Sequence, residues 1–498
     1  MKKIINVGLA VILTCSFYSC ENDFLDTTAT DSYNDETWWK TESQVISTIN
    51  GCYAVLRNDQ IGGTTHLRED NLTPNSWDMG GDEPVSVGAH NASNDDRFQN
   101  KWDANFMGIG RTNYLLENID KVNMSSTLNQ RIKGEAYFLR ALFYSNLVKY
   151  FGGVPLILDA PDFAEHRNLP RNSREEVLSQ VLADLDDAIA VLPLSYSGAD
   201  RGRATKGAAL ALKARVLLFE SRWSEVAQLT KELIDMKQFS LFPNYRDLFM
   251  QANEFNNEVI FDIQFKAPEF YNSYDVILVQ QQNVVPTLDL VNSYLMKDGL
   301  PIQESPLYDP ANPYENRDPR LKQTVVLPGQ MFRGIIRPEG HYYGTGFGLK
   351  KYTSYKDDVV QPDVVQSHTN FILIRYADVL LMYAEAQNEA AGPDLSVYDA
   401  VNLVRDRAGM PDIPEGLSKE QLREVIRHER RIEFVNESLY YHDIRRWRTA
   451  EVVLNAQVLN KNGEVVRTRS FNPQRDYLWP IHEITIQENP ALEQNPGY

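Results

Sequence analysis

Cysteine is scarce in this chain, with 3 among 498 residues. Cys15 and Cys20 stand five residues apart in LTCSFYSCENDFLDTT, and Cys52 lies in STINGCYAVL. Cys52 falls on the apolar side of a predicted helix, so we expect a small buried side chain with no chemistry. No motif of a cysteine-based catalytic site surrounds any of the three.

Long apolar runs are also lacking: the run over residues 4–14 is too short to span a membrane comfortably, and no later run is long enough. That first run follows an initial Met-Lys-Lys and leads to Ser19, which is the order of an export signal. The stretch SFYSC resembles the cleavage site of a bacterial lipoprotein signal. We therefore expect Cys15 to be lost and Cys20 to carry lipid as the new N-terminus; a plain secretory signal is the alternative. Cys52 then has no partner, which excludes a disulfide framework.

Positive charge is in deficit, because 50 Lys and Arg face 68 Asp and Glu and give a formal net charge of -18. Losing Lys2 and Lys3 with the signal removes two positive charges and takes this value from -18 to -20. No basic stripe interrupts the acidity, so nucleic acid is not an expected partner. The chain is rich in Tyr and Trp, a composition that suits sugar binding, although many of these rings must belong to the core.

Amphipathic segments with helical spacing occur in pairs, first over residues 128–193, then over 203–237, and again after Phe371. Ser173, with Glu176 three residues later, predicts an N-cap with a capping box, and Ser418 predicts another N-cap. The unit over residues 203–237 has the length of a tetratricopeptide repeat, roughly 34 residues. Its alanines provide small faces for close helix packing: Ala208, Ala209, Ala211 and Ala214. We expect a solenoid of helix pairs.

Two segments lack long amphipathic helices and are rich in Gly, Asn, Pro and Tyr. They cover residues 59–103 and about 239–370, and the second contains the alternating run EVIFDIQF. Long irregular segments on a helical scaffold are common places for binding surfaces. A polar tether over residues 20–37 precedes the first helix.

Several motifs of enzymes and metal proteins are incomplete or absent. HERRIEF, from His428, lacks the second histidine of a zinc-protease helix, because position 432 is Ile. We expect its charged residues to form ion pairs that join the last helices: Glu429, Arg430, Arg431 and Glu433, with Arg445 and Arg446. No Gly-x-Ser-x-Gly nucleophile turn is present.

Two loop motifs give weak signals. GTGFG, over Gly344–Gly348, has the wrong spacing for a phosphate loop and reads as a turn that needs permissive backbone. A group of oxygen-bearing residues could suit calcium, but its spacing fits no calcium loop, and solvated loop acids are the preferred interpretation: Asp78, Asp82, Glu83, Asn94, Asp95 and Asp96. We expect no metal and no cofactor.

Seven blocks in order resemble the SusD/RagB family of outer-membrane nutrient-binding lipoproteins. They are GEAYFLRALFYSNLVKYFGGVPL, RATKGAALALKARVLLF, DPRL, RYADVLLMYAEAQNEA, VNLVRDRAG, IRHERRIEFVNESLYYHDIRRW and the terminal NPGY. Together they span nearly the whole mature chain. The resemblance implies a mostly α-helical fold, with a tetratricopeptide-like scaffold of helix pairs, long irregular loops and a few short strands.

The same resemblance implies a function and a division of the chain. Members of this family face outward from the outer membrane, bind oligosaccharides without cutting them, and act as a lid over a SusC-like TonB-dependent transporter. The parts expected are a signal at 1–19, the tether at 20–37, an N-terminal SusD-like part at 38–250 and a C-terminal RagB/SusD part at 251–498. The N-terminal part holds the ligand loop 59–103, and the C-terminal part holds a loop-rich insertion at 251–370, helices at 371–447 and a tail.

Aromatic and polar loop residues are the candidate ligand contacts, because exposed rings stack on sugars while neighbouring polar groups bind hydroxyls. In the first loop they are Trp77 as the leading platform, with Arg68, Asp70, Asn71, Asn75 and Asp78. In the insertion they are Phe270, Tyr271, Tyr274, Tyr342, Tyr343 and Phe347. Trp102, Trp447 and Trp479 lie in structural blocks and are expected in the core.

Two alternatives remain open. A family relative serving peptide uptake would have a ligand groove with few exposed rings. A glycoside hydrolase would need two carboxylates facing each other across the sugar, and the sequence cannot place such a pair.

Overall fold

The computed structural model describes residues 38–498 except 79–82, 339, 341 and 343. The expected lipid site Cys20, the signal, the tether, Asp82 and Tyr343 therefore lie outside the described residues. No helix in the described part is long and apolar enough to cross a membrane.

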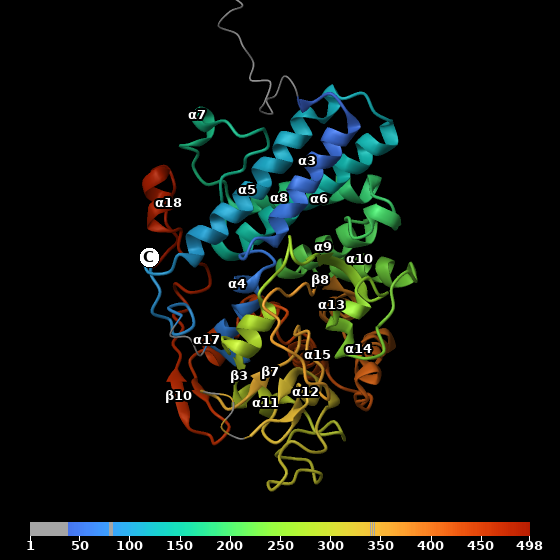
Figure 1. The fold of residues 1–498 in the computed structure, drawn as a ribbon, viewed down its shortest axis with the longest axis vertical. Coiled ribbons are helices and arrows are strands. Elements are labelled where there is room, and N and C mark those ends of the chain that lie inside the picture. The colour runs from blue at the N-terminus through green and yellow to red at the C-terminus, as the bar shows by residue number, and fades with distance from the viewer. Residues whose placement is uncertain (1–37, 79–82, 339, 341, 343) are drawn as a thin grey trace, which may run out of the picture.

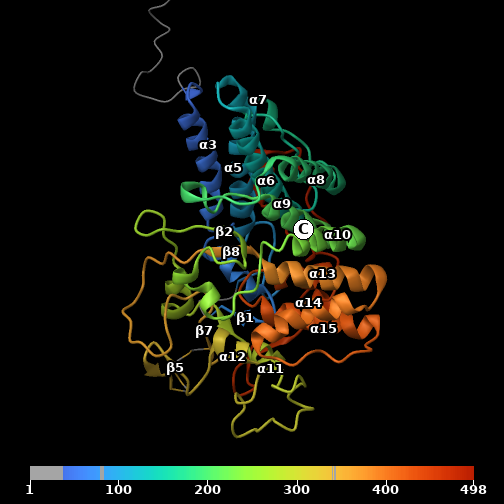
Figure 2. The ribbon, with the colours of Figure 1, turned by 90° about the vertical axis from the view of Figure 1, so that its right-hand side faces the viewer.

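Long helices form the scaffold, as the sequence pattern predicts. They are α3 (Glu42–Ala54), α5 (Arg97–Asn118), α6 (Ser126–Phe151), α8 (Arg174–Val191), α9 (Lys206–Phe219), α10 (Trp223–Asp235), α13 (Tyr376–Ala391), α14 (Leu395–Ala408) and α15 (Lys419–Glu433). Helix α6 packs on α5 and α8, α9 on α10, and α13 on α10, α14 and α15. Figure 2 shows α8, α10, α13, α14 and α15 following one another down one side of the molecule. The expected solenoid of helix pairs is confirmed.

Local signals set the ends of these helices. Ser173 and Ser418 each accept a hydrogen bond from the backbone N–H three residues on, in capping boxes closed by Glu176 and Gln421. Gly152 ends α6 with a φ of 77°. The four alanines of α9 are fully buried and let α8 and α10 approach closely.

The expected helix at Phe371 begins five residues later than predicted. Residues Phe371–Arg375 form strand β8, which pairs antiparallel with β2 (Val259–Ile263), the strand expected in EVIFDIQF. The apolar run FILI is fully or largely buried on both faces, and such short runs do not distinguish a strand from a helix start. Strands β2 and β8 lie across the middle of the molecule (Figure 2).

The remaining elements are short and lie mostly in the two irregular segments and the C-terminal region. The short α-helices are α4 (Thr64–Leu67), α7 (Phe163–His166), α11 (Leu288–Ser293), α12 (Pro319–Thr324), α16 (Tyr440–Arg446), α17 (Ala450–Val453) and α18 (Glu483–Glu488). The other short helices are η2 (Val55–Arg57), η3 (Arg68–Leu72), η4 (Ile119–Lys121), η5 (Gly198–Asp200), η6 (Asp247–Phe249), η7 (Gln251–Asn253) and the π-helical η8 (Val276–Gln280). Antiparallel two-stranded pairs are formed by β1 (Ser76–Trp77) with β3 (Val285–Pro286), β4 (Val325–Val326) with β7 (Gly348–Leu349), β5 (Met331–Phe332) with β6 (Ile335–Ile336), and β9 (Gln457–Leu459) with β10 (Val465–Thr468).

One hydrophobic cluster runs through both halves of the chain, from Trp39 to Leu492. It includes Cys52, Trp102 and Trp479 as expected, and burial raises the pKa of the Cys52 thiol to about 12. Trp447 is partly buried against a smaller cluster. The division at residues 250 and 251 stays a prediction, and the large cluster contains residues from both sides of it. Figure 1 shows α3, α5, α6 and α8 at one end and the strand-rich insertion at the other.

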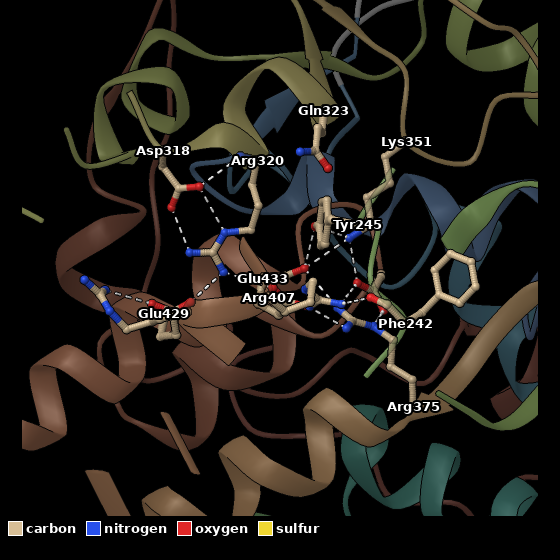
Figure 3. A network of polar contacts seen from close by, with 12 residues as sticks. Phe242, Tyr245, Asp318, Arg320, Gln323, Lys351, Arg375, Arg407, Glu429 and Glu433 are labelled. Atoms are coloured by element: carbon tan, nitrogen blue, oxygen red, sulfur yellow. Dashed lines mark hydrogen bonds and ion pairs between the residues drawn. The ribbon is translucent and has the colours of Figure 1, made fainter. Parts of the chain in front are cut away.

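A buried network of ion pairs joins α12, β8, α14 and α15 (Figure 3). The Nη1 atoms of Arg320 and Arg375 lie 2.9 and 2.6 Å from the carboxylate oxygens of Glu433, and Arg407 contacts the same carboxylate. Arg320 also lies 2.5 Å from Glu429. All five side chains are at most 4% exposed. The charges of HERRIEF therefore hold the insertion against the last helices.

The other charged residues of this segment have separate partners. Arg430 pairs with Asp378 of α13 and Asp443 of α16, and Arg446 pairs with Glu385 of α13. Arg431 pairs with Asp289 of α11, at 2.5 Å. Arg445 differs, because its guanidinium lies 3.6 Å from the ring centre of Tyr441. The expected ion pairs between the last helices are confirmed at Glu429, Arg430, Glu433 and Arg446. Arg431 instead pairs with the insertion, and Arg445 has no ion pair among the residues that the structure describes.

Candidate functional site

Most of the predicted ligand residues are buried. Those exposed by less than a tenth are Asp70, Asn71, Asn75, Trp77, Asp78, Tyr274, Tyr342 and Phe347. Phe270 and Tyr271 are 52% and 46% exposed, and Arg68 is partly exposed. The structure therefore separates the predicted set into internal residues and a few that reach the surface.

The prediction that Trp77 exposes its ring is wrong, because this side chain is only 5% exposed. Strand β1 pairs with β3 and sets Trp77 opposite Val285, and the ring packs in a small cluster with Val285 and Val458. The guanidinium of Arg469 lies 5.6 Å from the ring centre. Trp77 therefore connects the first loop to the C-terminal hairpin of β9 and β10, and its ring is not accessible to a ligand.

Three more predicted residues have internal roles. Asp70 accepts from the backbone N–H of Asn436, and burial raises its pKa to about 6. Asn71 donates to the carbonyl of Asn283 at 2.8 Å, and Asn75 accepts from Arg431 Nε at 2.9 Å. These groups were expected beside a ligand because sequence spacing cannot distinguish loop polar groups that face solvent from those that tie the loop down.

The aromatic candidates of the insertion also divide. The hydroxyl of Tyr274 donates to the carbonyl of Gly62, and Phe347 is fully buried. Tyr342 packs with Phe332 and Tyr355. The glycines of GTGFG adopt φ values of 66° and 82° at Gly344 and Gly346, as the expected permissive turn requires.

Arg68 lies at a polar depression of about 580 Å³ near α5. Its guanidinium pairs with Asp78 and, at 2.6 Å, with Glu83, while Arg97 lies 3.0 Å from Glu83. Burial opposes the charge of Arg97, but Glu83 and Asp95 raise its pKa.

These ion pairs correct the interpretation of the loop acids as solvated. Asp78 and Glu83 are buried against arginines, whereas Asn94 and Asp96 are exposed. Carboxylates already paired with guanidinium groups are poor calcium ligands without rearrangement.

A second pocket, of about 490 Å³, lies between the C-terminal end of α3 and the edge of β2. We call it the Phe270 pocket. It is lined by Asn50, Gly51, Tyr53, Ala54, Leu56, Arg57, Ala199, Arg201, Gly202, Arg203, Asp262, Ile263, Gln264 and Phe270. Two backbone hydrogen bonds between Lys266 and Phe270, of 2.6 and 2.8 Å, close the turn that presents the Phe270 ring. Among the predicted residues in the described part, Phe270 alone combines an exposed ring with a lining position.

Strand geometry directs the polar groups of the pocket. Asp262 in β2 and Gln264 just after it alternate in sequence with Phe261, Ile263 and Phe265, and both polar residues line the pocket. The sequence could have identified them, because the period-two pattern in VIFDIQF is visible without a structure.

Gly202 and the side chain of Gln264 lie close together in the lining of the pocket. Gly202 has a φ of 94°, and a Cβ there would stand 1.4 Å from Nε2 of Gln264. The positive φ favours glycine at this position, and a Cβ there would also displace the flexible side chain of Gln264.

The electrostatics of the pocket are unusual for an acidic chain. The guanidinium of Arg57 lies 4.3 Å from the ring centre of Phe270, and burial lowers its pKa. Arg203 pairs with Glu135 at 2.9 Å. Burial raises the pKa of Asp262 to about 6, although a hydrogen bond of 2.9 Å from Asn370 partly stabilises the ionised form. The pocket thus offers a ring face, amides and several guanidinium groups.

Among the residues that the structure describes, Asp159, Glu165 and His166 form a group close enough to share a metal ion. His166 Nδ1 accepts from the backbone N–H of Asp162 at 3.1 Å, and Nε2 lies 3.1 Å from Asp159. A neutral ring then carries its hydrogen on Nε2, the atom that a metal would need. We assign this group a hydrogen bond from His166 Nε2 to Asp159 rather than a metal site.

Comparison with known proteins agrees with the expected family. The model described as SusD family matches residues 257–498, and the model described as starch-binding associating with outer membrane matches residues 23–218. SusD-like protein P25 of Formosa agariphila is 27% identical over 482 residues, which cover 89% of this chain and 90% of that protein.

Solved structures show the same fold. A SusD-like protein of Bacteroides fragilis matches with a TM-score of 0.82 at 28% identity, covering 96% of this chain and all of that chain. A SusD-like carbohydrate binding protein of the same organism matches with a TM-score of 0.85 at 28% identity, covering 92% of this chain and all of that chain. The mostly helical fold and the family expected from the seven sequence blocks are thereby confirmed, and the chain belongs to the SusD family.

Proposed function

We propose that this protein is an outer-membrane lipoprotein, anchored through Cys20 and facing the exterior, that binds oligosaccharide and delivers it to a SusC-like TonB-dependent transporter. Support comes from the family description as starch-binding and associating with the outer membrane, and from the relative described as carbohydrate binding. The protein binds its ligand and does no chemistry on it.

One observation carries the proposal, namely the Phe270 pocket. A half-exposed ring lies there beside amide, carboxyl and guanidinium groups, within about 490 Å³. Flat apolar rings pack against the C–H faces of sugars, and the polar groups can bind hydroxyls on the rim. A pocket of this volume accommodates a few sugar units.

Binding is tested on the mature chain without its lipid cysteine, residues 21–498, by affinity gels and calorimetry against a panel of polysaccharides. We expect at least one glycan to bind and the Phe270→Ala variant to bind it about tenfold more weakly. Phe163→Ala is the matched control, because Phe163 is 79% exposed on α7 and does not line the pocket. Equal binding by the two variants would remove the pocket from the proposal, and absence of any glycan binding would remove the proposal.

The anchor is tested separately in the native host. Labelled palmitate should enter the full chain and fail to enter a Cys20→Ala variant, which should leave the outer-membrane fraction. Incubation of bound polysaccharide with the protein should release no reducing ends, and release that depends on a carboxylate pair would establish a hydrolase instead.

Burial of Trp77 favours one competing function, uptake of peptides by a family relative with few exposed rings. The same calorimetry with a peptide mixture distinguishes the two functions. Peptide binding without glycan binding would replace the proposal.

A further inference from the structure

We propose that the Phe270 pocket recognises an acidic group on its glycan, a carboxylate or sulfate held by Arg57 and Arg201. This inference rests on the proposed function and adds the substrate class of the same site. It follows from unpaired positive charge in the pocket of a strongly acidic protein.

Neither Arg57 nor Arg201 forms an ion pair with a carboxylate among the described residues, although the charge of Arg201 helps to lower the pKa of the nearby Asp262. Arg57 contacts the ring of Phe270, at 4.3 Å from its centre. Arg201 lies 4.7 Å from the ring centre of Phe255 and donates to the Phe255 carbonyl at 2.9 Å. Both guanidinium groups therefore retain N–H donors that no anion occupies.

The third arginine of the pocket shows the contrast. Arg203 pairs with Glu135 at 2.9 Å and with Asp200 at 2.7 Å, and it donates to Asn50. Its charge is compensated, so it shapes the pocket wall rather than attracting a ligand. Arg131 also pairs with Asp200, at 2.8 Å, which leaves that carboxylate shared between two arginines.

One carboxylate in the pocket, that of Asp262, would repel an acidic ligand. Asp262 lines the pocket, and its Oδ2 accepts a hydrogen bond from the side-chain amide of Asn370 at 2.9 Å. A single negative charge leaves the two unpaired guanidinium groups with a net positive charge. Each of them presents planar donors that match two oxygens of a carboxylate or sulfate.

The net negative charge of the whole molecule means that only a local positive site could attract an acidic glycan. A formal net charge of -18 repels anionic polymers at long range, so an unspecific attraction to acidic glycans is excluded. Recognition must come from a local site that compensates the field. A neutral glycan could only accept hydrogen bonds from these two guanidinium groups, whereas an acidic sugar placed on Phe270 would also gain the attraction between opposite charges.

The test compares acidic and neutral forms of one ligand by calorimetry on residues 21–498. The probes are a galacturonate oligosaccharide with its methyl ester, and a sulfated galactan oligosaccharide with its desulfated form. We expect one acidic form to bind at least tenfold more tightly than its neutral partner, with an affinity that falls as salt rises. The two pairs of probes distinguish a carboxylate from a sulfate ligand.

Variants locate the effect. Arg57→Gln and Arg201→Gln should each weaken binding of the acidic form about tenfold and binding of the neutral form much less, because the glutamine amide still donates hydrogen bonds but carries no charge. Phe270→Ala should weaken both forms. Arg167→Gln is the matched control, because Arg167 lies 5.7 Å from the ring centre of Phe163 in an arginine–phenylalanine pair outside the pocket. Unchanged melting temperatures show that each variant folds.

The outcomes separate this inference from the proposed function. Equal affinity for acidic and neutral forms, with weakening by Phe270→Ala, overturns the inference and leaves glycan binding standing. A preference for the acidic form that survives both arginine variants also overturns it. Absence of binding to any glycan overturns both.

Discussion

Neutralising Glu433 at the centre of the buried ion network tests how the insertion is held on the helical scaffold. Oε1 of Glu433 accepts hydrogen bonds from Arg375, at 2.6 Å, and from Arg407, and Oε2 accepts one from Arg320 at 2.9 Å. Burial alone would raise the pKa of this carboxyl, but the surrounding arginines hold it far below its usual range. The Glu433→Gln substitution keeps the shape and removes the charge.

The expected cost follows from what the amide leaves unpaired. Its NH₂ group must face Arg320 or the other two arginines, so at least one buried donor meets another donor (Figure 3). Breaking a buried ion pair costs about 3–5 kcal/mol. Each arginine keeps another carboxylate, for example Glu429 for Arg320, so the lower end applies and we expect a loss of about 3 kcal/mol.

Urea unfolding of residues 21–498, followed by circular dichroism and tryptophan fluorescence, measures this loss. With a slope of about 3 kcal/mol per molar, the midpoint should fall by about 1 M. Glu225→Gln is the control, since Glu225 pairs with Arg222 on the exposed face of α10, where an ion pair contributes less than about 1 kcal/mol. Equal shifts for the two variants would refute the reasoning that burial makes the Glu433 network costly to break.

Three further predictions concern acid, reactivity and backbone space. Burial raises the pKa of Asp378, but two buried arginines lower it to about 2, below its usual 3.8. The ionised carboxylate of Asp378 therefore stabilises the fold above pH 3.8, and this stabilisation is lost as the pH falls towards 2. Between pH 5 and 2 the urea midpoint of the Asp378→Asn variant should fall less steeply than that of the unchanged protein. Equal slopes for the two proteins would contradict this. Cys52, fully buried with a pKa near 12, should resist a thiol reagent in buffer at pH 8 and react in 8 M urea, and rapid labelling in buffer would show that the helix opens. Gly202→Ala should lower the melting temperature by several degrees and weaken glycan binding, because the new Cβ displaces the amide of Gln264; Gly416→Ala, also at positive φ but in open space, separates conformational strain from this clash.

Much of the scaffold could be predicted because its signals are local. The caps at Ser173 and Ser418 and the stop at Gly152 act within one helical turn, and each ends or starts a helix where expected. The sequence does not predict the strand that begins at Phe371, because pairing with a strand more than a hundred residues away decides whether this apolar run forms a strand or a helix.

The candidate site was predicted less well, for the same reason. Phe270 is expected at the surface and lies there, whereas Trp77 is expected to expose its ring and is buried. Both are aromatic residues in polar loops, and their local sequences do not differ in any way that reports burial. Arg57 was overlooked because it belongs to the end of a scaffold helix, and only the fold brings it to Phe270.

The sequence by itself determined the helix pairs, the family and the strong acidity of this protein, because periodicity, caps and composition are properties of neighbouring residues. Tertiary structure alone decided which loop rings are exposed, which acids are paired with arginines, and where unpaired positive charge collects. Burial and charge compensation depend on partners contributed from distant parts of the chain, such as α3 and the turn after β2 that meet at the Phe270 pocket.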